Sequence, residues 1–283
     1  MVSPQARREQ VALLCQGGLS KRRACGLLGL ARSGLSYALR QPGKDAPVLD
    51  AMRRLSSQYP RYGYRRIRIF LNREGLTMSP SRAERLWRKA KLQLPRKRPR
   101  RRAASRPRPL PPVAANHVWA YDFVFDACAN GQQLKCLTVV DEFTHECLAI
   151  DVAGSIRSRR VIDILARLIS VHGAPTYLRS DNGSEFVSTA ILRWLADNRI
   201  DTALIDPGKP WQNGTSESFN GKFRDECLSV EWFRTRAEAK ILIESWRHHY
   251  NAVRPHMSLN YLTPSEFKSQ HPNRHPTPAI FQE

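Results

Sequence analysis

The spacing of hydrophobic residues changes along the chain. Up to residue 94, apolar residues recur every three or four positions, which is the spacing of helices with one buried face. From His117, apolar and polar residues alternate as in half-buried strands, and helical and strand periods then follow one another. The pattern predicts an all-α front followed by an α/β remainder.

Three short helical segments fill the first unit, residues 1–41. We expect helices over 4–16, 21–28 and 33–39, with glycine turns between them and Ser20 as the N-cap of the second. Short helices joined by tight turns are typical of a helix-turn-helix, with a recognition helix around 32–40, although generic bundles share the pattern.

A second helix-turn-helix-type unit is predicted over residues 46–94, after a break at Pro42 and Gly43. It contains a helical stretch at 48–59, the motif Y-G-Y-R-R-I, and a helix starting at Ser79-Pro80, since proline is tolerated at the first helical position. The cations expected to contact DNA from this unit are Arg65, Arg66, Arg68, Arg82 and Arg85.

The net charge of +21 is concentrated in the front of the chain. Residues 1–115 hold 28 Lys/Arg against 5 Asp/Glu, whereas residues 116–283 hold 18 against 20. This asymmetry favours a nucleic-acid-binding front, although a solvated basic surface of the ribosomal type has the same balance. Within residues 95–115, six prolines and eight Lys/Arg predict an extended basic linker.

The order of elements after the linker predicts a ribonuclease-H-like α/β core over residues 116–270. Three antiparallel strands are expected at 118–126, 134–140 and 146–152. They are followed by helices at 158–172, 189–198 and 216–228, which alternate with strands at 176–179 and 202–205, and by a closing helix at 237–250. The result is a mixed five-stranded sheet with helices. We expect the tail, 271–283, to be poorly ordered.

Other sequence features indicate a cytoplasmic protein. Neither a membrane span nor a secretory signal is evident. The six cysteines form no C-x-x-C pair, which is typical of free thiols in a reducing compartment. In a bacterium, a DNA-binding protein of this kind would be associated with the nucleoid.

Three carboxylates form a candidate metal site. Asp122 lies mid-strand, opposite the aromatic residues of that strand. Asp181 follows a short strand, and Glu217 begins a helix, with 35 residues between these two acids. Carboxylate oxygens suit Mg²⁺, and two such ions ~3.5–4 Å apart catalyse phosphoryl transfer. Arg224, two helical turns after Glu217, could hold a DNA phosphate beside them, whereas Lys222 is rotated off that face.

Each acid also has an ordinary explanation. A strand aspartate is usually solvated, and Asp126 lies on the same face of the strand as Asp122 and competes for its role. Asp181-Asn182-Gly183 could be a plain turn, and an acid such as Glu217 is favoured at any helix N-terminus by the helix dipole.

Four motifs together resemble the integrase core of Asp-Asp-Glu transposases. They read W-A-Y-D-F, S-D-N-G-S-E-F, P-W-Q-N-G-T-S-E-S-F-N-G-K-F-R-D-E and Y-N-A-V-R-P-H-M-S-L. The chain is most similar to the second-frame transposases of bacterial insertion sequences, relatives of retroviral integrases. The resemblance covers residues 116–267 strongly, extends to 46–92 through the Y-G-Y-R-R-I unit and, more weakly, reaches 1–41. One departure is Phe123-Val124, where many relatives have threonine after the first aspartate.

The resemblance implies the chemistry. Asp122, Asp181 and Glu217 would be the catalytic acids, binding Mg²⁺ or Mn²⁺, with two ions per active site. Water would cleave the 3′ strand at the element's end, and the freed 3′-OH would attack target DNA without a covalent protein intermediate. The implied partners are terminal-repeat and target DNA, other copies in a synaptic complex, and the product of an upstream frame. Arg254, Pro255 and His256 match R-P-H and are assigned structural or DNA contacts.

Two alternatives stand beside a transposase. A ribonuclease H-like or structure-specific nuclease uses the same fold, but the tandem basic helical units argue against it. A DNA-binding regulator with an inactive core is the other, and the intact acidic set argues against that.

Overall fold

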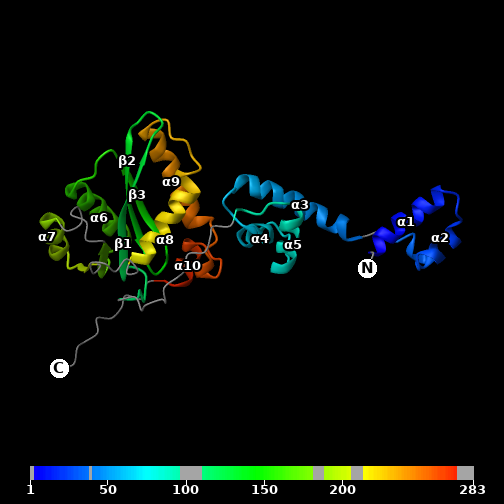
Figure 1. Cartoon of the computed structure of the whole chain (residues 1–283). Coiled ribbons are helices and arrows are strands. Elements are labelled where there is room, and N and C mark those ends of the chain that lie inside the picture. Colours follow the sequence, from blue (N-terminus) through cyan, green and yellow to red (C-terminus); the bar gives the residue numbers. More distant parts are fainter. Residues whose placement is uncertain (1–2, 38–39, 96–109, 181–187, 205–212, 273–283) are drawn as a thin grey trace, which may run out of the picture. The chain divides into compact units, whose positions relative to one another are not determined.

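The computed structural model describes residues 3–37, 40–95, 110–180, 188–204 and 213–272. The chain divides into two compact units, Met1–Gln93 and Leu94–Glu283 (Figure 1). Each is described by itself. Within the described ranges, every helix is too short or too polar to cross a lipid bilayer.

The first helices are short and capped by serines. Helices α1 (Pro4–Gln16) and α2 (Lys21–Leu27) begin where Ser3 and Ser20 accept backbone N–H bonds. The expected helix at 33–39 is instead a single 3₁₀ turn, η1 (Arg32–Gly34), in the part that the structure describes; residues 38 and 39 lie outside it. Serine and glycine at this point are weak helix formers.

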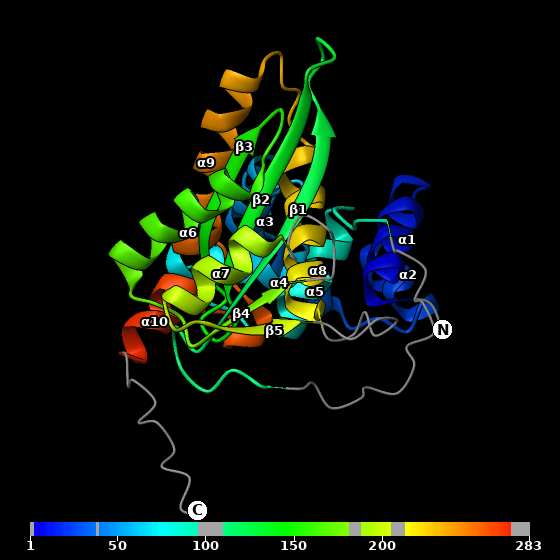
Figure 2. The same ribbon diagram turned by 90° about the vertical axis from the view of Figure 1, so that its left-hand side faces the viewer.

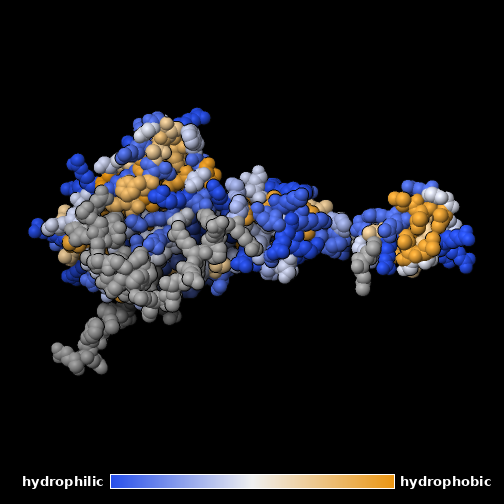
Figure 3. All heavy atoms as spheres, in the orientation of Figure 1, coloured by the Kyte–Doolittle hydropathy of each residue, from blue (hydrophilic) through white to orange (hydrophobic). Residues whose placement is uncertain are grey.

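The core of these first helices is small. Its buried members are Val11, Ala24 and Cys25. Apolar surface gathers over the same helices (Figure 3). Leu13 of α1 and Leu27 of α2 are 72% and 70% exposed.

The predicted break at Pro42 and Gly43 is wrong. Both residues lie inside helix α3 (Arg40–Gln58), which also contains Pro47. Pro42 occupies the first turn, where a helix has no N–H bond to lose, and Gly43 costs only about 1 kcal/mol of helix propensity. Burial of Val48, Met52 and Leu55 further along the helix outweighs these local signals.

Two further helices complete the first unit. Helix α4 (Tyr64–Arg73) buries Ile67 and Leu71, and α5 (Pro80–Lys89) begins at the expected cap, where Ser79 Oγ accepts the Arg82 N–H. The Y-G-Y motif contributes to an aromatic stack, in which the rings of Tyr59 and Phe70 lie 4.8 Å apart and Tyr62 stacks on both.

The second unit is built on the predicted five-stranded mixed sheet. Its strands are β1 (Val118–Ala127), β2 (Gln133–Asp141), β3 (Cys147–Ala153), β4 (Tyr177–Ser180) and β5 (Asp201–Leu204). The order is β3-β2-β1-β4-β5; the first three strands pair antiparallel, and β4 pairs parallel with β1 and β5. This is the expected ribonuclease-H-like arrangement.

Helices cover both faces of the sheet (Figures 1 and 2). Helices α6 (Ser158–His172) and α7 (Thr189–Asp197) lie on one face, and α8 (Gly214–Phe223) and α9 (Arg236–Ala252) on the other. Trp119 and Tyr121 of β1 pack in the cluster of α6 and α7, whereas Val124 packs with Phe219 of α8. Strand β1 is the middle strand of the sheet, and its side chains contribute to the apolar clusters on both faces.

Two details differ from the sequence prediction. The helix expected over 216–228 changes at Phe223 into a π-helical turn, η3 (Arg224–Leu228), which buries Cys227 and Leu228 in the α8 cluster. After the closing helix, the chain adds a 3₁₀ turn, η4 (Met257–Leu259), and helix α10 (Pro264–Gln270), which starts with a capping box at Thr263 and Glu266.

Candidate active site

Asp122 lies at the centre of β1, on the face covered by α8. It is half-buried and directly opposite Thr138 of β2. Its Oδ1 accepts the N–H of Phe123 at 2.8 Å, and its Oδ2 accepts Nδ2 of Asn220 at 2.8 Å. The neighbouring aromatic residues point to the opposite face, as the alternation predicts. A hydrogen bond therefore joins Asp122 to helix α8.

Glu217 lies in the first turn of α8, and its side chain is exposed. Helix α8 packs against β1 and β2. Asn220, which contacts Asp122, follows Glu217 by three residues, and residues three apart share one side of a helix. Glu217 therefore lies next to Asn220 around the helix, on the exposed flank of α8.

Asp181 lies outside the described residues. The preceding residue, Ser180, is buried at the end of β4, the strand next to β1, with Arg179 opposite Ala120. Among the residues that the structure describes, no three His, Cys, Asp or Glu side chains are grouped so that they could hold a metal ion. The three-acid cluster stays a prediction.

Asp126, the competitor for the role of Asp122, has a different setting. Its Oδ1 accepts the N–H of Ala127 at 2.8 Å. It lines a cavity of about 490 Å³ together with Phe125, Lys135 and Gly154. The Asn220 amide of α8 meets Asp122, four residues earlier on the strand.

The two predicted DNA contacts on α8 lie at its C-terminal end. Arg224 is exposed and Lys222 is partly buried. The backbone of Arg224 is still α-helical, with φ −62° and ψ −49°, so the two-turn spacing from Glu217 is kept. Arg224 therefore shares the side of α8 that carries Glu217.

Two of the cations predicted to contact DNA from the first unit bind a buried aspartate. Arg82 Nη2 lies 2.9 Å from Oδ1 of Asp45, and Arg85 Nη2 lies 3.3 Å from Oδ2. Asp45 is 1% exposed. Burial raises the pKa of its carboxyl group, but hydrogen bonds from Arg82, Gln41 and Arg85 outweigh this effect and lower the pKa overall.

The other three cations lie on α4. Arg66 lies over the ring of Tyr62 at 5.1 Å, and Nη1 of Arg68 donates to the Met78 carbonyl at 3.4 Å. Arg65 is exposed, with its Nε 3.3 Å from the Tyr64 hydroxyl. Of these three side chains, Arg65 is the most accessible to a ligand.

The R-P-H motif lies in the interior of the second unit. Arg254 binds Glu226 of η3 through two bonds of 2.6 and 2.5 Å. His256 is buried against Tyr250, and its Nε2 lies 3.2 Å from the Tyr250 carbonyl. Burial, followed by the charges of Arg254 and Lys222, lowers the pKa of His256 to about 2. The ring is therefore neutral and donates to the carbonyl, which is a structural role.

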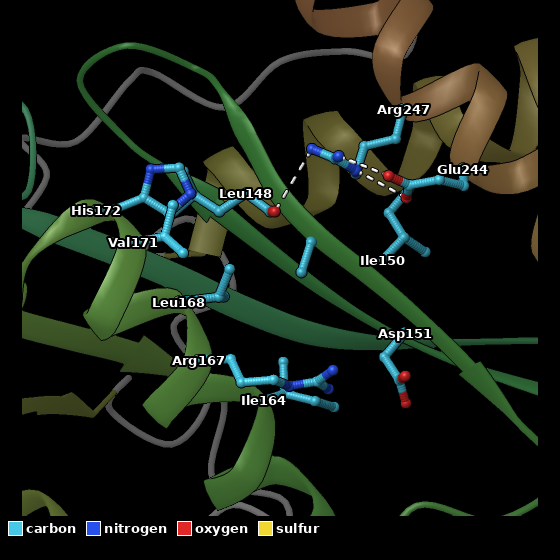
Figure 4. A pocket seen from close by; sticks show the side chains of 11 residues that line it. Leu148, Ile150, Asp151, Ile164, Arg167, Leu168, Val171, His172, Glu244 and Arg247 are labelled. Atoms are coloured by element: carbon cyan, nitrogen blue, oxygen red, sulfur yellow. Dashed lines mark hydrogen bonds and ion pairs between the residues drawn. The ribbon is translucent and has the colours of Figure 1, made fainter.

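A pocket that the sequence did not predict lies at the edge strand β3. It measures about 280 Å³ and opens between α6 and α9 (Figure 4). On one side Arg247 bonds Glu244 and the backbone carbonyl of Leu148, and on the other α6 contributes Leu168 and His172. Asp122 and Glu217 are not among its lining residues.

Comparison with known families and proteins identifies this chain. Two family models described as "Integrase core domain" match residues 112–210 and 198–264, and an "HTH-like domain" model matches residues 43–100. An uncharacterized 31.7 kDa protein of insertion element IS407 from Burkholderia multivorans is 44% identical over 94% of this chain and 96% of its own length. This chain belongs to the bacterial insertion-sequence transposases.

Further relatives agree with this membership. An uncharacterized 39.2 kDa protein of insertion element IS476 from Xanthomonas euvesicatoria is 37% identical over 99% of this transposase and 81% of its own length. The putative transposase InsK of element IS150 from Escherichia coli is 26% identical over 85% of this chain and 90% of its own length. The chain is therefore an enzyme of DNA cleavage and strand transfer with an HTH-like domain ahead of its integrase core.

Solved structures resemble the transposase more distantly. The HTLV-2 integrase catalytic core in complex with magnesium is 17% identical, covering 55% of this chain and 97% of that one, with a TM-score of 0.41. A simian T-cell lymphotropic virus intasome in complex with a regulatory subunit is 18% identical, covering 80% of this chain and 76% of that one, with a TM-score of 0.47. Scores this low carry no argument about the site.

Proposed function

We propose that the transposase binds two divalent metal ions, Mg²⁺ or Mn²⁺, through Asp122, Asp181 and Glu217, and that this site cleaves the 3′ strand and transfers it. The main support is the hydrogen bond between Asn220 and Asp122, because it ties the helix that carries Glu217 to the strand that carries Asp122. Asp181 lies outside the described residues and enters the proposal through the motif S-D-N-G-S-E-F.

The donor set fits such ions. Carboxylate oxygens are the hard ligands that Mg²⁺ and Mn²⁺ prefer. Asp122 is half-buried and Glu217 is exposed, so the two carboxylates combine a fixed ligand with one that solvent and DNA can reach. When bound, the ions would polarise the scissile phosphate and lower the pKa of the attacking water.

The chain's own residues would position DNA for two successive in-line substitutions. In the first, a water oxygen bonds to phosphorus at the element's end and the bond to the 3′ oxygen breaks, leaving a 3′-OH and a 5′-phosphate. In the second, that 3′-OH attacks a target phosphodiester, and the displaced target strand leaves as its own 3′-OH. Arg224, the first residue of η3 and two helical turns after Glu217, would hold a phosphate during both steps.

DNA binding would come from the helical front. Arg65, Arg66, Arg68, Arg82 and Arg85 are the candidate contacts there, with Arg224 and Lys222 in the core. Two element ends must be joined in one event, so copies of the chain would associate in a synaptic complex, with or without the product of an upstream frame. The substrates locate this activity at the bacterial nucleoid in the cytoplasm.

Strand transfer with oligonucleotides that carry the element's terminal repeats tests the proposal. The variants Asp122→Asn and Glu217→Gln should lose at least ~10³-fold in Mg²⁺-dependent transfer and still bind the oligonucleotide, because charge on the metal ligands is removed while the fold is kept. Asp126→Asn is the matched control and should transfer at the normal rate.

The outcomes separate the candidate functions. Retained transfer in Asp122→Asn would remove this residue from the active site. Metal-dependent nicking of hybrids or branched DNA, without joining, would favour a nuclease. Binding without any metal-dependent cleavage by the unmodified protein would favour a regulator with an inactive core.

A further inference from the structure

We propose that Asn220 and Thr138 are positioning residues that orient the Asp122 carboxylate toward the metal ions. The inference rests on the proposed function, since it requires Asp122 to be a metal ligand. Neither residue is itself a candidate ligand, and neither was predicted from the sequence. Both contact Asp122 directly in the folded core.

The three residues form a short hydrogen-bonded chain. Asn220 Nδ2 donates to Asp122 Oδ2 at 2.8 Å. The Thr138 hydroxyl lies 3.2 Å from Asn220 Oδ1 and 3.2 Å from the Asp122 backbone carbonyl. On the other carboxylate oxygen, Oδ1 accepts the N–H of Phe123 at 2.8 Å. Each oxygen of Asp122 therefore receives at least one protein donor.

The chain of bonds sets the direction of the amide. A side-chain amide donates at one end and accepts at the other. Because an ionised carboxylate only accepts hydrogen bonds, the NH₂ end of Asn220 faces Asp122, and Oδ1 faces the Thr138 hydroxyl. Thr138 is 1% exposed and pairs with Asp122 across β1 and β2, so the sheet itself fixes the hydroxyl.

Protein donors can orient a carboxylate that also binds a cation, because an ionised carboxylate offers about four acceptor sites. The donors also restrict rotation of the carboxylate about its χ2 bond, which removes an entropic cost that metal binding would otherwise carry. Hydrogen-bond partners of this kind typically change metal affinity about 10–100-fold when they are removed.

A purely structural role makes a different prediction. Asn220 could simply hold α8 to the sheet, but Phe219 and Phe223 of the same helix are 1% and 0% exposed in the apolar cluster beneath it. These rings attach α8 without the amide. Loss of the amide should therefore change the metal site more than it changes the stability of the metal-free protein.

The test is Mn²⁺ binding to the full chain without DNA, measured by titration calorimetry. Asn220→Leu keeps a similar volume and removes both polar ends, and it should weaken Mn²⁺ binding about 10–100-fold. The unfolding temperature in EDTA should stay within about 3 °C of the unmodified protein, as for a change under 1 kcal/mol. In strand transfer, kcat should fall while KM for DNA is unchanged.

Two threonine variants make the test sharper. Thr138→Val is isosteric and removes the hydroxyl that orients the amide, so it should weaken Mn²⁺ binding in the same direction, by less than Asn220→Leu. Thr138→Ser keeps the hydroxyl and should bind Mn²⁺ as the unmodified protein does. If Asn220→Leu fails to fold in EDTA, the comparison of Thr138→Val with Thr138→Ser decides.

Asp122→Asn separates the two proposals. If it weakens Mn²⁺ binding while Asn220→Leu and Thr138→Val bind normally, the positioning role is overturned and the proposed function survives. If Asp122→Asn itself binds Mn²⁺ normally, Asp122 is not a ligand and both proposals fail. Parallel losses in all three variants, with Thr138→Ser unaffected, support the positioning role.

Discussion

Arg254 and Glu226 form a two-point ion pair inside the catalytic unit. Their bonds measure 2.6 and 2.5 Å, and the two side chains are 1% and 6% exposed. The pair links the segment after α9 to the π-helical turn that continues α8. Because α8 carries Glu217, this ion pair anchors the helix of a proposed metal ligand at its far end.

Removing one partner of this pair should strongly destabilise the catalytic unit. We expect Arg254→Met to lower the free energy of unfolding by about 3–5 kcal/mol, since it leaves the Glu226 carboxylate buried without its guanidinium partner. Native-state hydrogen exchange of the β1 and β2 amides reports this loss. Arg160→Met is the control: its pair with Asp151 is 43% and 20% exposed and should contribute about 1 kcal/mol or less. Equal losses in both variants would contradict the prediction.

Stability of the catalytic unit should fall on mild acidification. Burial, followed by the charges of Arg254 and Lys222, lowers the pKa of His256 to about 2, below an unfolded value of about 6.5. The unfolded chain therefore takes up the proton first as the pH falls. The stability contributed by the neutral ring is complete above pH ~6.5 and decreases below it by about 1.4 kcal/mol per pH unit.

The measurement is hydrogen exchange or urea unfolding between pH 7.5 and 5. His256→Gln should reduce the slope of the unfolding free energy against pH by the amount that corresponds to uptake of nearly one proton. His117, His172 and His249 also have lowered pKa values, chiefly through burial, and act in the same direction, so part of the slope should persist in the variant. An identical slope with and without His256 would refute its assignment.

The spacing of apolar residues was sufficient to predict those helices whose buried face is encoded within one continuous segment. Helix α6 begins at Ser158 and ends at His172 as expected, because Val161, Ile164, Leu165 and Leu168 repeat at helical spacing over the whole segment. The break at Pro42 and Gly43 failed for the opposite reason. Two local signals were outweighed by burial of residues further along α3.

Contacts between distant residues could not be predicted in the same way. Asn220 and Asp122 are 98 residues apart, and no periodicity marks an asparagine that will meet a strand aspartate. Glu226 and Arg254 are likewise 28 residues apart and look like ordinary surface charges in the sequence. Motif resemblance predicted the three acids. The contacts of Asn220 with Asp122 and of Arg254 with Glu226 became visible only when helix α8 was packed on the sheet.

Asp45 should stabilise the first unit at neutral pH and lose this effect in acid. The hydrogen bonds from Arg82, Gln41 and Arg85 outweigh burial and hold its folded pKa below the unfolded value of about 3.9. Its contribution is therefore present above pH ~4 and disappears as the pH falls through the folded pKa. Asp45→Asn should cost about 1–2 kcal/mol at pH 7, because both arginines are partly exposed.

Hydrogen exchange of α3 and α5 amides in the full chain measures this cost. The difference between Asp45→Asn and the unmodified protein should shrink towards pH 3. Asp50→Asn is a suitable control on the same helix, since the Asp50 side chain is 74% exposed and pairs with Arg53 at the surface. A difference that is constant with pH would show that the Asp45 charge is not responsible.

The arginines of the first unit should divide into two groups when DNA binding is measured over a range of salt concentrations. Arg65 is exposed on α4, so Arg65→Ala should reduce the slope of log K against log[salt] by about 0.9, the value for one phosphate contact, and leave hydrogen exchange unchanged. Arg82 is bound to the buried Asp45 carboxylate, so Arg82→Ala should increase exchange in α3 and α5 whatever it does to the slope. If Arg65→Ala leaves the salt slope unchanged, α4 does not contact phosphates through this residue. If Arg82→Ala leaves hydrogen exchange unchanged, the ion pair between Arg82 and Asp45 contributes nothing to folding, and the Arg82 side chain is available to DNA.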